Sequence, residues 1–132
     1  MTVRPMMQRD QASAALGMVV EVDEPGRSVV SMRVREDMTN GFAITHGGLV
    51  FALADTAFAI ACNEDERVTV AAGADITFLK ATRAGQTLTA EAVRRTVSGR
   101  TVTPPPGHEE RPPLLRTRRP GHRACRGAWR RG

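Results

Sequence analysis

Two kinds of group that act at a carbonyl carbon lie close together in the middle of the chain. His46, Gly47 and Gly48 come directly before an apolar run, and Asp55 is the single charge in that run before Glu64. Glycines at a helix start leave backbone N–H groups unobstructed at the positive end of the helix dipole, where an oxyanion can approach. We take the Gly47 N–H as the candidate oxyanion donor and Asp55 as a general base or a nucleophile.

Spacing separates these two groups too far for them to act within one helix. Asp55 follows Gly47 by eight positions, which is about 12 Å along a helix axis and roughly 80° around it. One helix therefore cannot place both groups on one carbonyl carbon. We expect a site shared by two antiparallel helices across a twofold axis, in which Gly47 of one subunit faces Asp55 of the other.

The neighbouring polar residues each have a structural and a functional interpretation. His46 is a candidate catalytic residue that either contacts the substrate or orients the loop as a cap. Asn40, Gly48 and Thr56 are candidate substrate-binding residues, although Asn40 is first of all a turn former. Thr56 either hydrogen-bonds Asp55 or only its own helix backbone. For Asp55 itself we favour catalysis over a bridging role, because an unpaired buried charge is costly.

Upstream of these residues, the pattern predicts a short helix and a hairpin. Residues 6–16 are mostly good helix formers and stop at Gly17, a residue suited to the left-handed position past a helix end. From residue 18 the hydrophobic period changes to two and continues to residue 35, interrupted by a turn with Pro25 and Gly26 at its centre. Residues 18–35 are therefore predicted to be a hairpin.

Downstream, the pattern predicts one long buried helix and two strands. The run from His46 to Glu64 is apolar almost all round, with Thr45 expected to cap it. Alternating apolar residues at 68–79 and 86–97 predict strands. This order predicts an α+β domain with a mostly antiparallel sheet packed on one central helix.

The segment NGFAITHGGLVFALADTAFAIACN, residues 40–63, resembles the hotdog-fold acyl-CoA thioesterases, most closely their phenylacetate-degradation (PaaI-type) branch. The resemblance rests on Asn-Gly, on His-Gly-Gly and on Ala-Asp-Thr-Ala, and it continues to about residue 100. It implies a hotdog fold, a long helix wrapped by an antiparallel sheet, with subunits paired into homodimers and commonly homotetramers. It also implies hydrolysis of an aryl- or medium-chain acyl-CoA, such as hydroxyphenylacetyl-CoA, to free acid and CoA without a cofactor.

Two other functions fit a hotdog domain. Hydratases of enoyl-CoA esters pair an acidic residue with a catalytic histidine in a different motif from the one at 46–56. A non-catalytic acyl-CoA-binding or regulatory domain whose Arg-rich tail contacts nucleic acid is the second alternative. The tail holds one aromatic residue, Trp129, and no helix-turn-helix or zinc spacing. We therefore expect an enzyme without a nucleic-acid partner.

The last 32 residues differ from the rest of the chain. Residues 1–100 hold 11 Lys and Arg against 12 Asp and Glu, whereas residues 101–132 hold 8 Arg against 2 Glu, so the net charge of +5 belongs to the tail. We predict a hotdog domain at 1–103 that lacks the family's last two strands, and a Pro/Arg/Gly-rich segment at 104–132 that is disordered or irregular. Eighteen Arg and one Lys indicate a GC-rich gene. Out-of-frame translation of the tail is our hypothesis, with an evolved basic arm as the alternative.

Length and composition limit the remaining classes. The chain has 132 residues, 41% of them hydrophobic, which fits one globular domain. No uncharged apolar stretch reaches 18 residues, so we expect no membrane partner. The first residues contain no apolar core before their charges, so we expect a cytoplasmic protein. Cys62 and Cys125 suit neither a disulfide scaffold nor a zinc site, and we expect reduced thiols and no metal.

Overall fold

The fold consists of one antiparallel sheet and one long helix. The computed structural model describes residues 4–63, 68–98, 114–117 and 124–128. In chain order the elements are α1 (Pro5–Gln8), α2 (Gln11–Ala15), β1 (Val19–Glu24), β2 (Arg27–Arg33), the 3-10 turn η1 (Glu36–Met38), α3 (Gly47–Cys62), β3 (Ala71–Ala74), β4 (Thr87–Ser98), β5 (Leu114–Thr117) and β6 (Ala124–Ala128).

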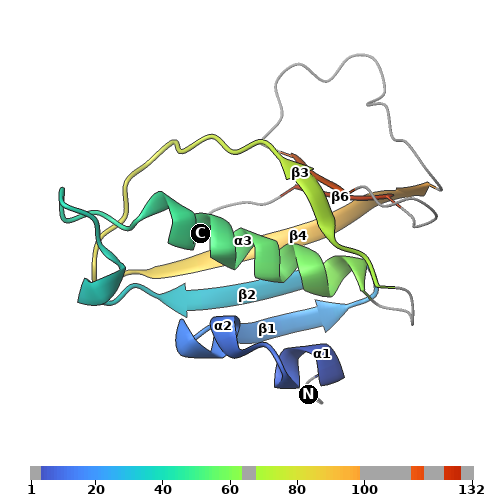
Figure 1. The fold of residues 1–132 in the computed structure, drawn as a ribbon, viewed down its shortest axis with the longest axis horizontal. Coiled ribbons are helices and arrows are strands. Elements are labelled where there is room, and N and C mark those ends of the chain that lie inside the picture. Colours follow the sequence, from blue (N-terminus) through green and yellow to red (C-terminus); the bar gives the residue numbers. More distant parts are fainter. Residues whose placement is uncertain (1–3, 64–67, 99–113, 118–123, 129–132) are drawn as a thin grey trace.

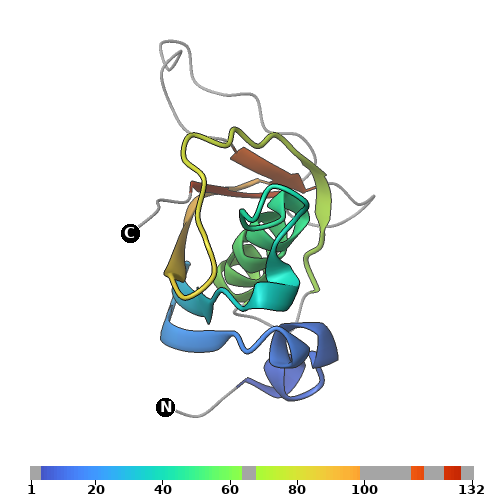
Figure 2. The ribbon, with the colours of Figure 1, turned by 90° about the vertical axis from the view of Figure 1, so that its left-hand side faces the viewer.

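The strands form a single sheet in the order β1-β2-β4-β6-β5-β3, and neighbouring strands are antiparallel. Helix α3 crosses one face of this sheet (Figure 1). The view in Figure 2 shows the strands curving around α3. A long helix wrapped by an antiparallel sheet is the hotdog arrangement, so the predicted α+β hotdog fold is confirmed. No helix in the described ranges has the length and apolar character needed to span a bilayer.

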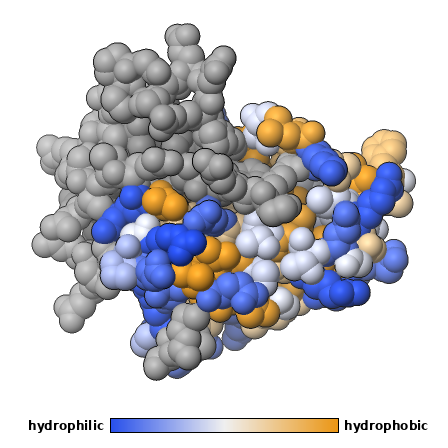
Figure 3. All heavy atoms as spheres, turned by 180° about the vertical axis from the view of Figure 1, so that it is seen from behind, coloured by the Kyte–Doolittle hydropathy of each residue, from blue (hydrophilic) through white to orange (hydrophobic). Residues whose placement is uncertain are grey.

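The hairpin follows the predicted alternation. Gly26 at its turn has φ +71°, a conformation that glycine adopts without steric cost. On β2, Val30, Met32 and Val34 (which follows the strand) are at most 1% exposed. Val30 pairs with Ala90 of β4 in the ladder. The β2 residues that alternate with these are half-buried or exposed, and the coloured part of the surface in Figure 3 shows both hydrophilic and hydrophobic residues.

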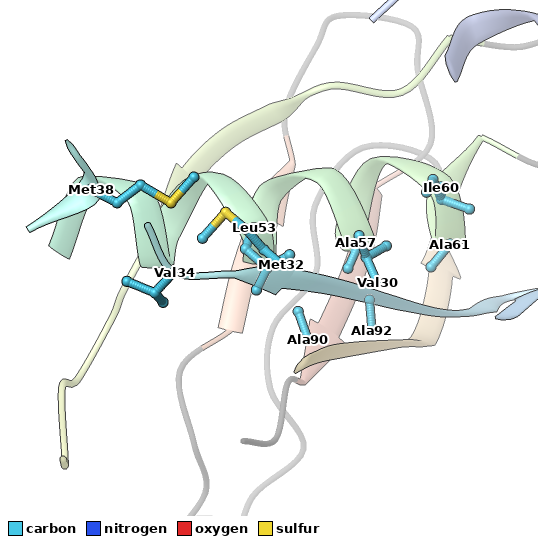
Figure 4. Packing of buried hydrophobic residues seen from close by; sticks show 10 residues of the cluster. All are labelled: Val30, Met32, Val34, Met38, Leu53, Ala57, Ile60, Ala61, Ala90 and Ala92. Atoms are coloured by element: carbon cyan, nitrogen blue, oxygen red, sulfur yellow. The ribbon is translucent and has the colours of Figure 1, made fainter. Parts of the chain in front are cut away.

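Small side chains let α3 lie close to the sheet. Ala57 and Ala61 of α3 pack among Val30 of β2 and Ala90 and Ala92 of β4 (Figure 4), and all five are nearly fully buried. Close packing of this kind leaves little room for added atoms. Beside them, the buried Ser28 Oγ of β2 donates a 2.5 Å hydrogen bond to the Ala57 carbonyl oxygen.

The C-terminal end of α3 is held by the first described residue. The Arg4 guanidinium donates to the carbonyl oxygens of Ile60 (3.0 Å) and Asn63 (2.6 Å), and it also pairs with Asp23 of β1. Carbonyl groups in the last turn of a helix have no partner within the helix, and a cation satisfies them well. One side chain thus connects the N-terminal segment, β1 and α3.

The N-terminal helix differs from the prediction. Instead of one helix over residues 6–16, there are two short helices interrupted at Arg9 and Asp10. Asp10 is the N-cap of α2 and accepts a hydrogen bond from the Ser13 N–H, which starts a new helix. Gly17 ends it with φ +66°, as predicted.

The strand predicted at 68–79 is much shorter in the structure. Only Ala71–Ala74 form β3, because this edge strand pairs with β5, which itself has four residues. Val68, Val70 and Phe78, which the alternation placed on a buried face, are 64%, 43% and 52% exposed. An apolar surface is therefore left uncovered in the single chain.

The C-terminal segment also differs in part. The sequence pattern predicts no strand in this tail, whereas the structure describes two short strands there, β5 and β6, which pair with each other and lie between β4 and β3 in the sheet. Both segments are free of proline, so their N–H groups can join a ladder. The other residues of 104–132 lie outside the described ranges. The expectation of a reduced thiol is wrong for Cys62, which is disulfide-bonded.

Replacing Ala57 tests the close approach of α3 and the sheet. Ala57→Leu should destabilise the fold by about 1–3 kcal/mol, since three extra heavy atoms must displace buried neighbours. The matched control is Ala14→Leu at an exposed position of α2, where the same enlargement should change stability by less than about 0.5 kcal/mol. Urea unfolding followed by circular dichroism measures both. Equal stability of the two variants would contradict the packing described.

Candidate active site

The loop before α3 is organised by Asn40. Its Oδ1 accepts hydrogen bonds from the N–H groups of Phe42 (2.9 Å) and Ile44 (3.4 Å), and its own N–H donates to the Ile44 carbonyl oxygen (2.8 Å). Between them Ala43 adopts φ +55°, which is unusual for a residue other than glycine. Asn40 is thus a turn former, as the sequence indicated, and its half-buried side chain leaves Nδ2 without a partner among the described residues.

The cap of α3 differs from the prediction. Thr45 does not cap the helix, because its Oγ1 and N–H bond instead to Thr82. His46 is the N-cap, and its Nδ1 accepts a 3.1 Å hydrogen bond from the Gly48 N–H. A neutral imidazole that accepts at Nδ1 carries its proton on Nε2. The exposed His46 ring therefore offers an N–H donor away from the helix, while the Gly48 N–H is already used.

The Gly47 N–H is the first of the helix and is left unsatisfied by the described residues. The N–H groups of Leu49 and Val50 both donate to the His46 carbonyl oxygen, and that of Gly48 to its ring. Gly47 lines a cavity of about 480 Å³, and the Phe78 ring lies beside it. An unsatisfied N–H at the positive end of a 16-residue helix suits a developing oxyanion.

The cavity is lined by both apolar and polar side chains. The apolar ones include Ile44, Val50, Leu53 and Leu88, and the polar ones include Asn40, Thr45 and Thr82. Asp55 does not line it. In a single chain, the structure thus brings Gly47 and Asn40 to the same cavity but leaves Asp55, His46, Gly48 and Thr56 outside its wall.

Asp55 is a half-buried carboxylate in the middle of α3. Among the described residues, no hydrogen-bond donor and no cation meets its oxygens. Burial raises the pKa of Asp55, and the negative charge of Asp10 raises it further. A carboxylate without a partner on an apolar helix is free to accept a proton, which is what a general base does.

Asp10 and Ser13, which the sequence did not indicate as site residues, bond to each other, and Ser13 also bonds to the residue next to Asp55. Thr56 bonds neither to Asp55 nor to its own helix backbone through its hydroxyl, but lies 2.8 Å from the Ser13 hydroxyl of α2. Ser13 in turn donates to Asp10, the cap of that helix. The spacing of Asp10 and Ser13 is a recognisable helix-start signal, whereas their contact with α3 has no signal in the sequence.

No metal site accompanies these groups in the described ranges. Groups of three or more His, Cys, Asp or Glu with the arrangement of metal ligands are absent from that part of the chain. The groups described above that can act on a substrate are a carboxylate, an unsatisfied backbone N–H and an imidazole N–H.

Known proteins resemble this chain in sequence and in structure. The family model of the Thioesterase superfamily matches residues 42–103. Over 88 residues the chain is 47% identical to the acyl-coenzyme A thioesterase PaaI of Escherichia coli (strain K12); the match covers 66% of this chain and 62% of that relative, so the chain spans less than two thirds of its length.

Two solved structures are similar to this chain along most of their length. The E. coli PaaI protein from the phenylacetic acid degradation operon has a TM-score of 0.68 and 33% identity, covering 96% of this chain and 88% of its own. The TT0310 protein from Thermus thermophilus has a TM-score of 0.68 and 30% identity, covering 92% of this chain and 97% of its own.

The raised pKa of Asp55 predicts a dependence of stability on pH. A raised pKa means that the folded state binds this proton more tightly than the unfolded state, so stability is lost as pH rises from the ordinary aspartate range through the raised value. Asp55→Asn removes that loss, and its Tm should exceed that of the wild type above this range, with the difference closing at acid pH. Thermal unfolding at several pH values measures it.

Asp37 provides the matched control. Its hydrogen bond from Arg35 lowers the pKa of this exposed carboxyl, which is the opposite sign. Asp37→Asn should therefore leave Tm at neutral pH unchanged or slightly lower. If Asp55→Asn and Asp37→Asn behaved alike, the environment assigned to Asp55 would be incorrect.

Proposed function

Because this chain belongs to the thioesterase superfamily, we propose that it is an acyl-CoA thioesterase that hydrolyses its substrate to a free acid and CoA. The observation that carries this proposal is the Asp55 carboxylate, half-buried and unpartnered among the described residues, eight positions after an unsatisfied Gly47 N–H. Structural carboxylates in such surroundings are normally paired. The proposal includes the cytoplasmic location expected from the sequence.

The proposed reaction uses both groups at one thioester. The Gly47 N–H donates to the carbonyl oxygen and stabilises the negative charge that develops there. Asp55 either accepts a proton from the water that attacks the carbonyl carbon, or attacks it directly and is released by water afterwards. In the first route the carbon–sulfur bond breaks as the sulfur takes the proton that Asp55 accepted from water, which gives the free acid and the CoA thiol. In the second route the sulfur leaves as a thiolate when Asp55 forms an acyl anhydride. Water then hydrolyses the anhydride, which regenerates Asp55, and the proton released goes to the thiolate. The His46 Nε2–H is a further donor to the substrate.

For the substrate we propose an aryl- or medium-chain acyl-CoA, such as hydroxyphenylacetyl-CoA, in phenylacetate catabolism. The names of the similar E. coli proteins refer to this degradation and to acyl-CoA. A cavity of about 480 Å³ beside Gly47 has room for a group of that size, and Val50, Leu53 and Leu88 give it an apolar wall. Asn40 and Thr45 supply polar contacts at the same cavity.

Removing the proposed base tests the activity directly. Asp55→Asn should keep the fold and lower kcat by at least about a hundredfold, since a general base typically contributes that much. The measurement is release of free thiol from a panel of acyl- and aryl-CoA esters. Glu21→Gln, which removes a charge on the exposed face of β1, is the control and should retain the wild-type rate. An Asp55→Asn variant with near-wild-type turnover would refute this assignment.

We further propose that the active form is a homodimer or homotetramer in which two chains share each site. In one chain Gly47 lines the cavity and Asp55 does not, which agrees with the helical spacing of these residues. Exposed apolar side chains at Val68, Val70, Phe78 and Leu79 give the single chain a surface that a second copy would cover. The open edge of β3 lies next to this surface.

A substitution at Gly47 can remove the proposed oxyanion donor, its backbone N–H, while α3 still begins at this residue. Proline is well tolerated at the first position of a helix, and the ψ of 128° at His46 suits a residue before proline. Gly47→Pro should therefore keep the fold and lower kcat by about a hundredfold or more. Gly47→Ala adds the first side-chain carbon while keeping the N–H, and is the matched control. It should retain most of the activity, with the exposed Phe78 ring moving aside.

The same variant tests whether sites are shared. When Gly47→Pro and Asp55→Asn chains are co-expressed, a mixed dimer contains one site with both groups intact. Random pairing then restores about a quarter of the wild-type activity, although each variant alone is nearly inactive. No recovery in mixed dimers, or an active monomer in sedimentation, would show that each site belongs to one chain.

A further inference from the structure

A buried hydrogen-bond chain joins the N-terminal segment to the helix that carries Asp55. Asp10 accepts from Ser13 twice, from the N–H at 2.9 Å and from Oγ at 2.6 Å. The Ser13 Oγ lies 2.8 Å from the Thr56 Oγ1. Ser13 and Thr56 are only 4% and 8% exposed, so water does not compete strongly for these bonds.

The direction of this chain follows from proton counting. A serine hydroxyl has one proton, and an ionised carboxylate only accepts. Since the Ser13 proton goes to Asp10, the Thr56 hydroxyl must donate to Ser13. The chain therefore runs from the residue after Asp55 to a fixed negative charge, which fixes both the rotation of this turn of α3 and the position of Asp10.

Other charged groups near α3 are compensated or do not act on Asp55. On β2 and β4, Arg27 and Glu91 pair with each other, and Arg27 also pairs with Glu24 of β1, while Asp23 of β1 pairs with Arg4. The other charged side chains that are described on the strands packed against α3 are Glu21, Arg33 and Arg94. None of these affects Asp55, whereas Asp10, which has no cation partner in the described ranges, does.

We propose that Asp10, acting through Ser13 and Thr56, is a positioning residue for Asp55 in thioester hydrolysis; this rests on the proposed function of Asp55. The hydrogen-bond chain holds the Asp55 turn in place, and the Asp10 charge makes Asp55 a stronger base. The N-terminal segment is then part of the catalytic apparatus rather than only a cover for the sheet. A helix cap without this role would affect stability and leave the pH dependence of the reaction unchanged.

Asp10→Asn separates the two roles. Asparagine caps helices as well as aspartate does, so the fold should be kept. Loss of the charge should shift the acid limb of the kcat/KM profile to lower pH and reduce kcat at neutral pH about two- to tenfold, with KM nearly unchanged. Asp10→Ser, a second neutral cap, should show the same shift. Glu21→Gln is the control for loss of an exposed charge and should show none.

Ser13→Ala tests whether the hydrogen bond between Ser13 and Thr56 positions the turn of α3 that carries Asp55. It removes the link to Thr56 but leaves Asp10 its bond from the backbone N–H, so kcat should fall several-fold with the acid limb unmoved. The proposal is overturned if Asp10→Asn and Asp10→Ser leave the acid limb where it is in the wild type, or if Ser13→Ala has wild-type kcat.

A readout independent of turnover separates this inference from the proposed function. Carbon-13 NMR of the full-length protein follows the titration of the Asp55 carboxyl, whose pKa should be lower in Asp10→Asn than in the wild type. An unchanged titration overturns the role of Asp10 whatever the activity. Absence of thiol release by the wild type, or full activity of Asp55→Asn, would instead refute the proposed function.

Discussion

An apolar helix that carries one carboxylate has to be covered on every side except the one where that carboxylate works. The sheet covers α3 along β2 and β4 with small residues, so that helix and strands approach closely. Arg4 binds the last carbonyl groups of the helix, and α2 covers its middle. Because these neighbours bond to or pack against α3, the helix has little freedom to rotate, and the positions of Gly47 and Asp55 relative to the sheet are fixed.

Patterns of period two and 3.6 were sufficient to predict much of the fold. In the hairpin, α3 and β4, buried apolar residues recur at the spacing of a strand or a helix. For these elements the local pattern and the tertiary environment agree. The failures occur where a single local interaction decides. Asp10 divides the N-terminal helix by capping at its middle, and β3 is as short as the partner strand that it pairs with.

The candidate site shows the same division. Gly47, His46 and Asp55 could be proposed as site residues from the sequence, because glycines at a helix start and a single carboxylate in an apolar run are visible in it directly. Thr45 was wrongly predicted as a cap because nothing local indicates that Thr82, far along the chain, bonds to it. The bond between Ser13 and Thr56 escaped for the same reason, since both are small hydroxyl residues with many possible partners.

Because the N-terminal segment bonds to α3, the residue at which the polypeptide begins affects how this helix is held. Two further methionines, Met6 and Met7, follow Met1 closely. A polypeptide initiated at either of them would lose Arg4, and with it the bonds to the end of α3, but would keep Asp10 and Ser13. Two preparations differing by five or six residues would thus share Asp10, Ser13 and Thr56 and differ in the anchoring of the helix, so their kinetics are comparable only when their first residue is stated.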